Sequence, residues 1–224
     1  MNVLVACEES QEVCMAFRAK GHRAFSADLQ DCSGGHPEWH IKGDVIPLLN
    51  GNCTFQTADT HTHTQTGRWD LIIAHPPCTY LSSAGAARLY KDVHDGDFQM
   101  INVERLKKGI EGRDFFMACL NADCPRIAVE NPTPLAIYAL PKASQSIQPY
   151  QFGHPYSKKT LLWLKGLPPL FPTDCVIPEH SWVSGGSKRH DGSPRKDRGM
   201  GFRDSKKRSK TFPGIAMAMA EQWG

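Results

Sequence analysis

The sequence predicts an α/β fold with a mostly parallel central sheet and helices on both faces. Residues 2–28 read as strand, turn, helix, strand and closing acid, which is the length of one half of a dinucleotide-binding fold. Two further short apolar runs, 70–74 and 126–129, have the look of buried parallel strands and are each followed by a proline-containing turn. A chain of 224 residues is long enough for one such domain or for one domain with a small addition.

The first unit is delimited by its end signals. Residues 2–6 are apolar and partly β-branched, as in a buried strand, and residues 23–27 form the second strand, which Asp28 closes. Between them, apolar side chains at helical spacing predict a helix. Ser10 is its predicted N-cap, and Gly21 is the residue that stops it.

The remaining elements follow from composition and periodicity. Residues 103–119 carry apolar side chains near one face and predict a core helix. The apolar run 161–164 predicts a strand, the proline-rich run 166–182 a connection without helix, and the Ala/Met-rich run 212–223 a final helix. Residues 56–66, rich in threonine and histidine, predict a mobile surface loop.

Composition excludes several classes of protein. No apolar run is long enough to cross a bilayer, and the first residues lack the basic region of a secretory signal, so we expect a cytoplasmic protein without membrane contact. Reduced thiols are expected there. The cysteines lack the paired short spacing of a zinc ribbon, and no metal site is predicted; they are Cys7, Cys14, Cys32, Cys53, Cys78, Cys119, Cys124 and Cys175.

A stiff turn follows the run 70–74. His75, Pro76 and Pro77 stop the strand because proline donates no ladder hydrogen bond and fixes φ. Cys78 therefore sits just past the carboxyl end of a strand, where open α/β sheets bind ligands. Each proline also restrains the residue before it, so the turn can aim a nucleophile. The alternative is that Cys78 is a small buried hydrophobic residue.

These residues resemble a known family. Residues 70–85 are similar to the catalytic loop of the C5-cytosine methyltransferases, whose core is Pro-Cys or Pro-Pro-Cys after a strand; Thr79 stands where that family has glutamine. The Glu130-Asn131 pair after the run 126–129 resembles the family motif whose glutamate holds the target base. The resemblance implies that Cys78 is the nucleophile, Glu130 the partner of cytosine N3, and Asn131 and Lys158 supporting residues.

The chemistry explains why such residues are needed. Carbon 5 of cytosine is a poor nucleophile until a thiolate adds at C6 and an acid protonates or hydrogen-bonds N3. The activated carbon then takes a methyl group from S-adenosylmethionine (SAM), and loss of the C5 proton and of the thiolate restores the ring. A free thiol titrates near roughly 8.5, so the cysteine must be activated.

The resemblance also implies SAM as the cofactor, bound at the carboxyl edge of the first strands and by the last helix. The family's first motif contains glycines that let the backbone approach SAM, and this chain has none there, so rearranged binding is expected. A modified SAM stays open as the donor. The implied SAM-binding residues are Ala6, Cys7, Glu8, Ser10, Asp28, Leu29, Asp44, Val45, Pro76, Gly214 and Ala216.

Positive charge gathers late in the chain. Residues 187–210 contain ten lysines and arginines against three aspartates, a composition that suits phosphate backbones or, alternatively, a solvated linker. Residues 156–160 resemble the family's Gln-x-Arg-x-Arg motif, with Tyr156, Lys158 and Thr160 at its three positions. The expected DNA-binding residues are Ser82, Ser83, Lys159, Arg189, Arg195, Arg198, Arg203, Lys207 and Arg208.

The sequence hypothesis is thus a compact, phage-like DNA cytosine-5 methyltransferase of Rossmann-like fold. Its expected parts are a SAM-binding catalytic domain (1–165), a small basic target-recognition segment (166–211) and a helix packing back on the catalytic domain (212–224). Its partner is double-stranded DNA with the cytosine flipped out of the stack. Three matters stay open: a free cytosine nucleotide or RNA as the substrate, a degraded scaffold that only binds nucleic acid, and a monomeric or dimeric state.

Overall fold

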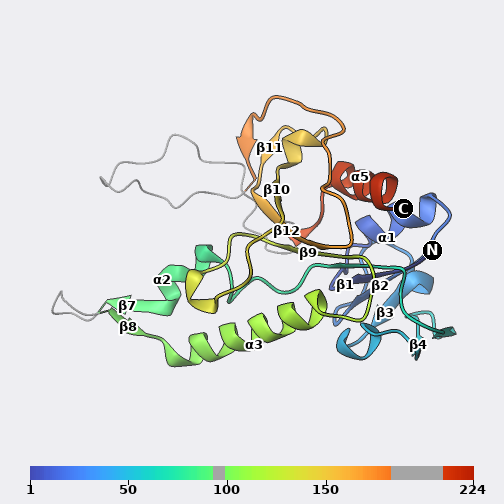
Figure 1. Cartoon of the computed structure of the whole chain (residues 1–224), viewed down its shortest axis with the longest axis horizontal. Coiled ribbons are helices and arrows are strands. Elements are labelled where there is room, and N and C mark those ends of the chain that lie inside the picture. The colour runs from blue at the N-terminus through green and yellow to red at the C-terminus, as the bar shows by residue number, and fades with distance from the viewer. Residues whose placement is uncertain (93–98, 183–208) are drawn as a thin grey trace.

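A seven-stranded sheet forms the centre of the computed structural model, which describes residues 1–92, 99–182 and 209–224 (Figure 1). The strand order is β10-β12-β9-β6-β1-β2-β3. Pairs along β9-β6-β1-β2-β3 are parallel, whereas β12 runs antiparallel to both β9 and β10. The strands are β1 (Asn2–Ala6), β2 (Arg23–Asp28), β3 (His40–Lys42), β6 (Leu71–Ala74), β9 (Ile127–Asn131), β10 (Gln145–Ile147) and β12 (Thr160–Lys165).

This order confirms the predicted mostly parallel α/β fold. The chain builds outward from β1 through β2 to β3, then returns to the other side of β1 with β6 and β9. Such a reversal is the topological switch point of a Rossmann-like sheet, and ligands bind in the crevice outside the carboxyl ends of the strands there. The edge formed by the ends of β1, β2, β6 and β9 is therefore where a site is expected.

Helices cover both faces of the sheet (Figure 1). α1 (Glu12–Ala19) and α5 (Pro213–Trp223) pack against each other on one face, and α3 (Val103–Leu120) lies on the other. Alternation along β1 explains the two cores, because Val3 and Val5 join the α1–α5 side whereas Leu4 and Ala6 join the α3 side. The helices predicted over 103–119 and 212–223 are confirmed.

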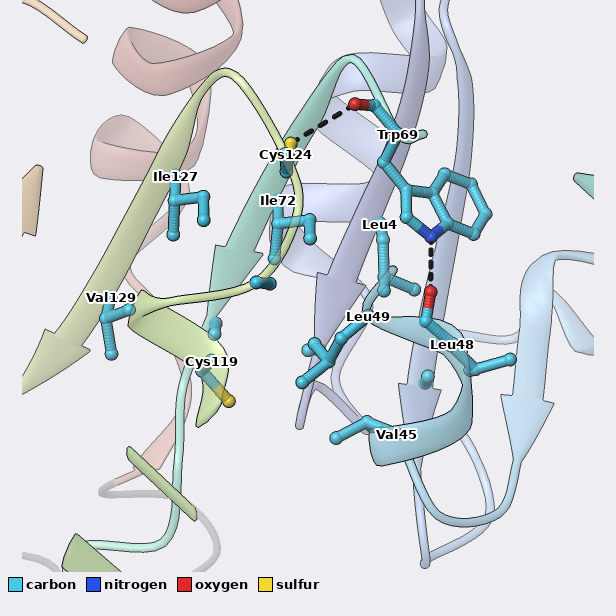
Figure 2. Packing of buried hydrophobic residues seen from close by; sticks show 14 of the residues in the cluster. Leu4, Val45, Leu48, Leu49, Trp69, Ile72, Cys119, Cys124, Ile127 and Val129 are labelled. Carbon is cyan, nitrogen blue, oxygen red and sulfur yellow. Dashed lines mark hydrogen bonds between the residues drawn. The ribbon is translucent and has the colours of Figure 1, made fainter. Parts of the chain in front are cut away.

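The core on the α3 side is tied together by two hydrogen bonds (Figure 2). The Trp69 indole N–H donates to the Leu48 carbonyl at 2.7 Å, and the Cys124 thiol donates to the Trp69 carbonyl at 3.2 Å. Leu4 and Ile72 from the sheet are fully buried in the same cluster. Full burial of each such aliphatic side chain contributes about 1.5–3 kcal/mol, so the strands that carry the site are firmly held.

The prediction of a mobile loop over 56–66 is wrong. β4 (Cys53–Gln56) and β5 (Thr62–Gln65) pair antiparallel as a hairpin. Phe55 anchors it: the ring is buried and meets Phe25 edge-on at 5.1 Å, and His63 from β5 lies 5.0 Å from the same Phe25 ring. These aromatic contacts supply the burial that the polar composition of the segment hides.

Short elements complete the described chain. They are η1 (Pro37–Trp39), η2 (Ile46–Leu48), η3 (Ser83–Gly85), α2 (Ala86–Leu89), β7 (Tyr90–Asp92), β8 (Gln99–Ile101), η4 (Ala136–Tyr138), η5 (Pro149–Gln151), β11 (Tyr156–Ser157) and β13 (His180–Ser181). Among the residues that the structure describes, no helix is both long and apolar enough to span a bilayer. All eight cysteines are described and unbridged.

Candidate active site at the carboxyl edge of the sheet

The Cys78 turn and the Glu130-Asn131 pair follow neighbouring parallel strands. Continuing the β6–β9 register past the last paired residues places His75 beside Glu130 and Pro76 beside Asn131. Side-chain contacts agree with that register: His75 Nδ1 lies 3.4 Å from Glu130 Oε2, and the Asn131 amide donates to the Pro76 carbonyl at 3.4 Å. The two motifs that the sequence singled out therefore meet at one point of the edge.

The turn that carries Cys78 is fixed on both sides. The Cys78 carbonyl accepts hydrogen bonds from the amides of Leu81 at 3.1 Å and Ser82 at 2.9 Å, which closes a tight turn. Beyond it, the Ser83 amide donates to the Thr133 carbonyl at 2.9 Å, so the loop is joined to the segment that follows β9. Cys78 itself is partly exposed, at a position whose carbonyl these two hydrogen bonds hold.

A cation from α3 holds the next two residues of this loop. Arg105 donates to the Thr79 carbonyl at 2.7 Å, and its guanidinium lies 4.9 Å from the Tyr80 ring centroid. Lys108, one turn along α3, lies 5.5 Å from the same ring. This contact could not be predicted from the sequence, because nothing in residues 103–119 reveals which loop the helix faces.

Glu130 is a half-buried carboxylate among positive groups. Its side chain is 21% exposed and that of His75 is 11% exposed. Burial raises the pKa of Glu130, but the hydrogen bond from His75 and the charges of Lys158 and His75 outweigh burial, so the pKa lies below its usual value. Lys158 is thus close enough to act on Glu130, and its backbone amide is held by the Gln148 side chain at 2.8 Å.

The turn after β1 has no glycine and is nevertheless left-handed at two residues. Cys7 has φ 60° and Gln11 has φ 62°, a region that costs a non-glycine residue about 1–2 kcal/mol. Gln11 is held there by its own side chain, which accepts from the His36 amide at 3.1 Å and donates to the His36 carbonyl at 2.8 Å. Gln11, and not Ser10, is the N-cap of α1, so the predicted cap is wrong.

The buried carboxylate of Glu8 replaces that cap. It accepts from the amides of Val13 at 2.7 Å and Cys14 at 3.2 Å, two of the groups that a helix start leaves unpaired. Burial raises the pKa of Glu8 to about 7, although the charge of His75 and these two hydrogen bonds lower it. The chain's own carboxylate therefore occupies amides that a ligand anion would otherwise use.

Two more acids lie along the same edge, beyond β1. Burial raises the pKa of Cys7, and the charges of Asp28 and Asp44 raise it further, so both acids act on the turn after β1. Leu29 and Ile46, which flank the acids in sequence, expose 74% and 41% of their surface. Carboxylates beside exposed apolar side chains suit a ligand with hydroxyl groups, a cationic centre and an apolar ring.

The other residues predicted to hold SAM differ in accessibility. Gly214 lies where a Cβ would strike the Phe152 carbonyl, and its amide donates to His154 Nε2 at 2.9 Å. Ala216 is buried among α1 and α5 side chains, which makes both residues parts of the packing. The buried members of the predicted set, besides these and Glu8, are Ala6, Ser10, Val45 and Pro76.

The predicted DNA contacts are only partly within the described residues. Ser82 is buried and its hydroxyl accepts from the Ala84 amide at 3.2 Å, whereas Ser83 and Lys159 are exposed. The remaining predicted contacts lie outside the described residues; they are Arg189, Arg195, Arg198, Arg203, Lys207 and Arg208.

A cavity of about 420 Å³ lies elsewhere, at the amino half of β2. Its arginines are engaged within the protein: Arg18 donates to the Ala24 carbonyl at 2.7 Å, and Arg23 donates to the Gln65 side chain at 3.0 Å. No cluster of three or more metal-ligating side chains occurs in the described part of the chain. The lining residues are Arg18, Arg23, Phe25, Glu38, Trp39, Asp59, His61 and His63.

Comparisons with known proteins give little. No protein-family model and no curated protein matches the chain. Among solved structures, the chain is similar to the crystal structure of a mutant DNMT2 from Spodoptera frugiperda, at 16% sequence identity and a TM-score of 0.37. The match covers 80% of this chain and 57% of that one, so the chain spans little more than half of the neighbour's length. A likeness this distant carries no conclusion about activity.

Proposed function

We propose that this protein transfers a methyl group from SAM to carbon 5 of cytosine in DNA through a covalent Cys78 adduct. One observation carries the proposal: the turn after β6 carries a partly exposed cysteine, and His75 and Pro76 of the same turn contact Glu130 and Asn131 at the end of the adjacent parallel strand. Neither motif alone has this specificity, because buried cysteines and strand-end glutamates are common.

Each residue of the site has its own part in the proposed reaction. The Cys78 thiolate forms a bond to C6; the C5=C6 π pair shifts to C4=C5, and the C4=N3 π pair moves to N3, which takes a proton from Glu130. Lys158 and His75 hold Glu130 in place electrostatically. Asn131, fully buried, fixes the Pro76 carbonyl and with it the start of the turn. The C4=C5 pair then forms the bond to the methyl group, the C4=N3 bond is restored and N3 returns its proton to Glu130. Finally water takes the C5 proton, the C5–H pair becomes the C5=C6 bond, and the S–C6 pair leaves with the Cys78 thiolate.

The acids beyond β1 fit SAM. When bound, SAM supplies the methyl group as an electrophilic sulfonium compound. Asp28 ends β2, as does the acid that accepts ribose hydroxyls in dinucleotide-binding folds, and Asp44 adds negative charge beside a cationic ligand. Leu29 and Ile46 offer apolar surface for an aromatic base. Glu8 occupies the Val13 and Cys14 amides, so the carboxylate of SAM needs other partners.

Duplex DNA must present the cytosine outside the stack for C6 to reach Cys78. Exposed Lys159 beside Lys158 supplies positive charge near the site. The basic run 187–210 is proposed to bind phosphates. Its deletion should weaken DNA binding and flatten the dependence of affinity on salt; an unchanged salt slope would contradict that assignment.

The test is methyl transfer from labelled SAM to three substrates: duplex DNA, RNA and free cytosine nucleotides. The proposal expects 5-methylcytosine in DNA, lost by about 10⁴-fold or more in Cys78→Ala and retained in Cys175→Ala, which removes an exposed cysteine. If only RNA or only the free nucleotides became methylated, that molecule and not DNA would be the substrate. No product, together with no SAM binding, would favour a scaffold that binds nucleic acid.

A further inference from the structure

His75 contacts one carboxylate of the edge and acts electrostatically on another. Its backbone amide donates to the Ala6 carbonyl at 2.9 Å, which fixes it at the end of β1 as well as β6. Nδ1 faces Glu130 at 3.4 Å, and the charge of Glu8 from the β1–α1 turn acts on the same ring. Nε2 is buried and has no hydrogen-bond partner among the described residues.

The contact with Glu130 fixes the direction of the hydrogen bond. Because the pKa of Glu130 lies below its usual value, its carboxyl group is ionised at neutral pH and can only accept. Nδ1 of His75 therefore carries the proton of this pair. An ionised Glu130 has none to give to cytosine N3, so the proposed reaction needs a proton source behind it.

We propose that His75 is a positioning residue that supplies the proton which Glu130 passes to N3 of cytosine. The inference rests on the proposed function and adds a residue to it. An imidazole ring can both donate and accept a proton, and His75 is the side chain whose ring nitrogen lies within hydrogen-bond distance of the Glu130 carboxylate. The groups facing it are Glu130 from β9 and Glu8 from the β1–α1 turn, with Lys158 acting on Glu130.

The step balances within the site. As the S–C6 bond forms, the proton on Nδ1 moves to Glu130 Oε2, the Glu130 proton moves to N3, and His75 changes from imidazolium to neutral imidazole. When methylation draws electrons back from N3, the proton returns to Glu130 and then to His75. No oxidant, reductant or further reactant is required.

The experiment measures the rate at which Cys78 forms its adduct with DNA containing 5-fluorocytosine, between pH 5.5 and 8.5. His75→Asn keeps an N–H donor near the Nδ1 position but cannot titrate. We expect an adduct rate about 100-fold lower near pH 7, with the pH dependence of the wild type flattened. The matched control is His61→Asn, which alters an exposed histidine paired with Asp59 at 2.7 Å and should change nothing.

A second readout does not depend on activity. Carboxyl NMR titration of Glu130 should show its pKa moving up in His75→Asn, because the charge of His75 is lost. Wild-type adduct formation with an unchanged rate and pH profile in His75→Asn would overturn this inference and leave the proposed function standing. No adduct in the wild type would overturn the proposed function, and the inference with it.

Discussion

Glu8 and Glu130 both feel the charge of His75, and their pKa values move in opposite directions. Glu8, in the turn after β1, is buried against two helix amides, and burial raises its pKa to about 7. Glu130, at the end of β9, is also penalised by burial, but His75 and Lys158 bring its pKa below the usual value. Two identical side chains thus differ through their surroundings: one caps the start of α1, and the other pairs with His75.

The same contrast separates the two halves of the edge. At β6 and β9, stiff turns and a hydrogen-bonded pair fix groups that the sequence already displays. At β1, the expected glycines are absent, and Cys7 and Gln11 take left-handed backbone instead. The β6–β9 half of the edge therefore carries residues that resemble the family motifs, whereas the turn after β1 lacks glycine and reaches left-handed backbone with Cys7 and Gln11.

The largest expected difference between Glu8 and Glu130 is the effect of their replacement on the rate of methyl transfer. Glu130→Gln should lower the rate of methyl transfer by about 10³-fold, since it removes the acid at N3, whereas Glu8→Gln should lower it less than about 10-fold. Single-turnover measurements with saturating SAM give both rates. Equal losses in the two variants would mean that the edge does not divide these roles.

Stability against pH should distinguish the same pair. The folded-state pKa of Glu8, about 7, exceeds its ordinary value of 4.5, so its contribution is fully present below about pH 4.5 and is lost as pH rises through 7. Relative to Glu8→Gln, the wild type should lose roughly 3 kcal/mol of unfolding free energy over that range. Glu130, with its lowered pKa, contributes stability above its unfolded pKa and loses it in acid. Urea unfolding of the wild type and of Glu8→Gln from pH 4 to 8 measures the Glu8 contribution, and a flat difference between the two would contradict the assignment.

Replacing Asp28, the acid proposed to bind SAM at the end of β2, should weaken SAM binding without altering Cys78. Asp28→Asn should lower SAM affinity about 10-fold by calorimetry, equivalent to about 1.4 kcal/mol, because a hydroxyl loses a charged acceptor. Asp31→Asn, which alters an exposed aspartate paired with Lys42 at 2.7 Å, is the control. Similar SAM affinity in both variants would remove Asp28 from the cofactor site.

The left-handed turn should show the smallest effect. Cys7→Gly and Cys7→Ala both lose the thiol, but only glycine relieves the positive φ of 60°. The glycine variant should therefore unfold with a free energy about 1 kcal/mol higher than the alanine variant. A more stable alanine variant would mean that the backbone at this turn relaxes.

The sequence could predict which residues stand at the ends of strands, but it could not predict which side chains form contacts between neighbouring strands. Cys78 and Glu130 were found because each follows an apolar run and a parallel sheet brings such ends to one edge. From the sequence, His75 is predicted only to stop a strand, because its contact with Glu130 depends on the β6–β9 register. The sequence predicts Ser10 as the helix cap because serine has the better propensity; the hydrogen bonds of Glu8 to the first helix amides follow from the left-handed backbone at Gln11, which propensity does not predict.

The β4–β5 hairpin could not be predicted from the amino-acid composition of its segment. Its polar sequence predicts a loop, and the burial that orders it comes from Phe25 on a distant strand. The fold class needed only periodicity, because parallel strands and their helices bury continuous apolar surface.

The most direct test of the account is a covalent trap with DNA containing 5-fluorocytosine in many sequence contexts, incubated with the protein and SAM. Fluorine at C5 blocks the last elimination, so an enzyme that adds a thiolate at C6 stays attached to its DNA. The account predicts a denaturation-resistant adduct that maps to Cys78, disappears in Cys78→Ala and persists in Cys175→Ala. SAM binding without any adduct, or an adduct that survives Cys78→Ala, would contradict it.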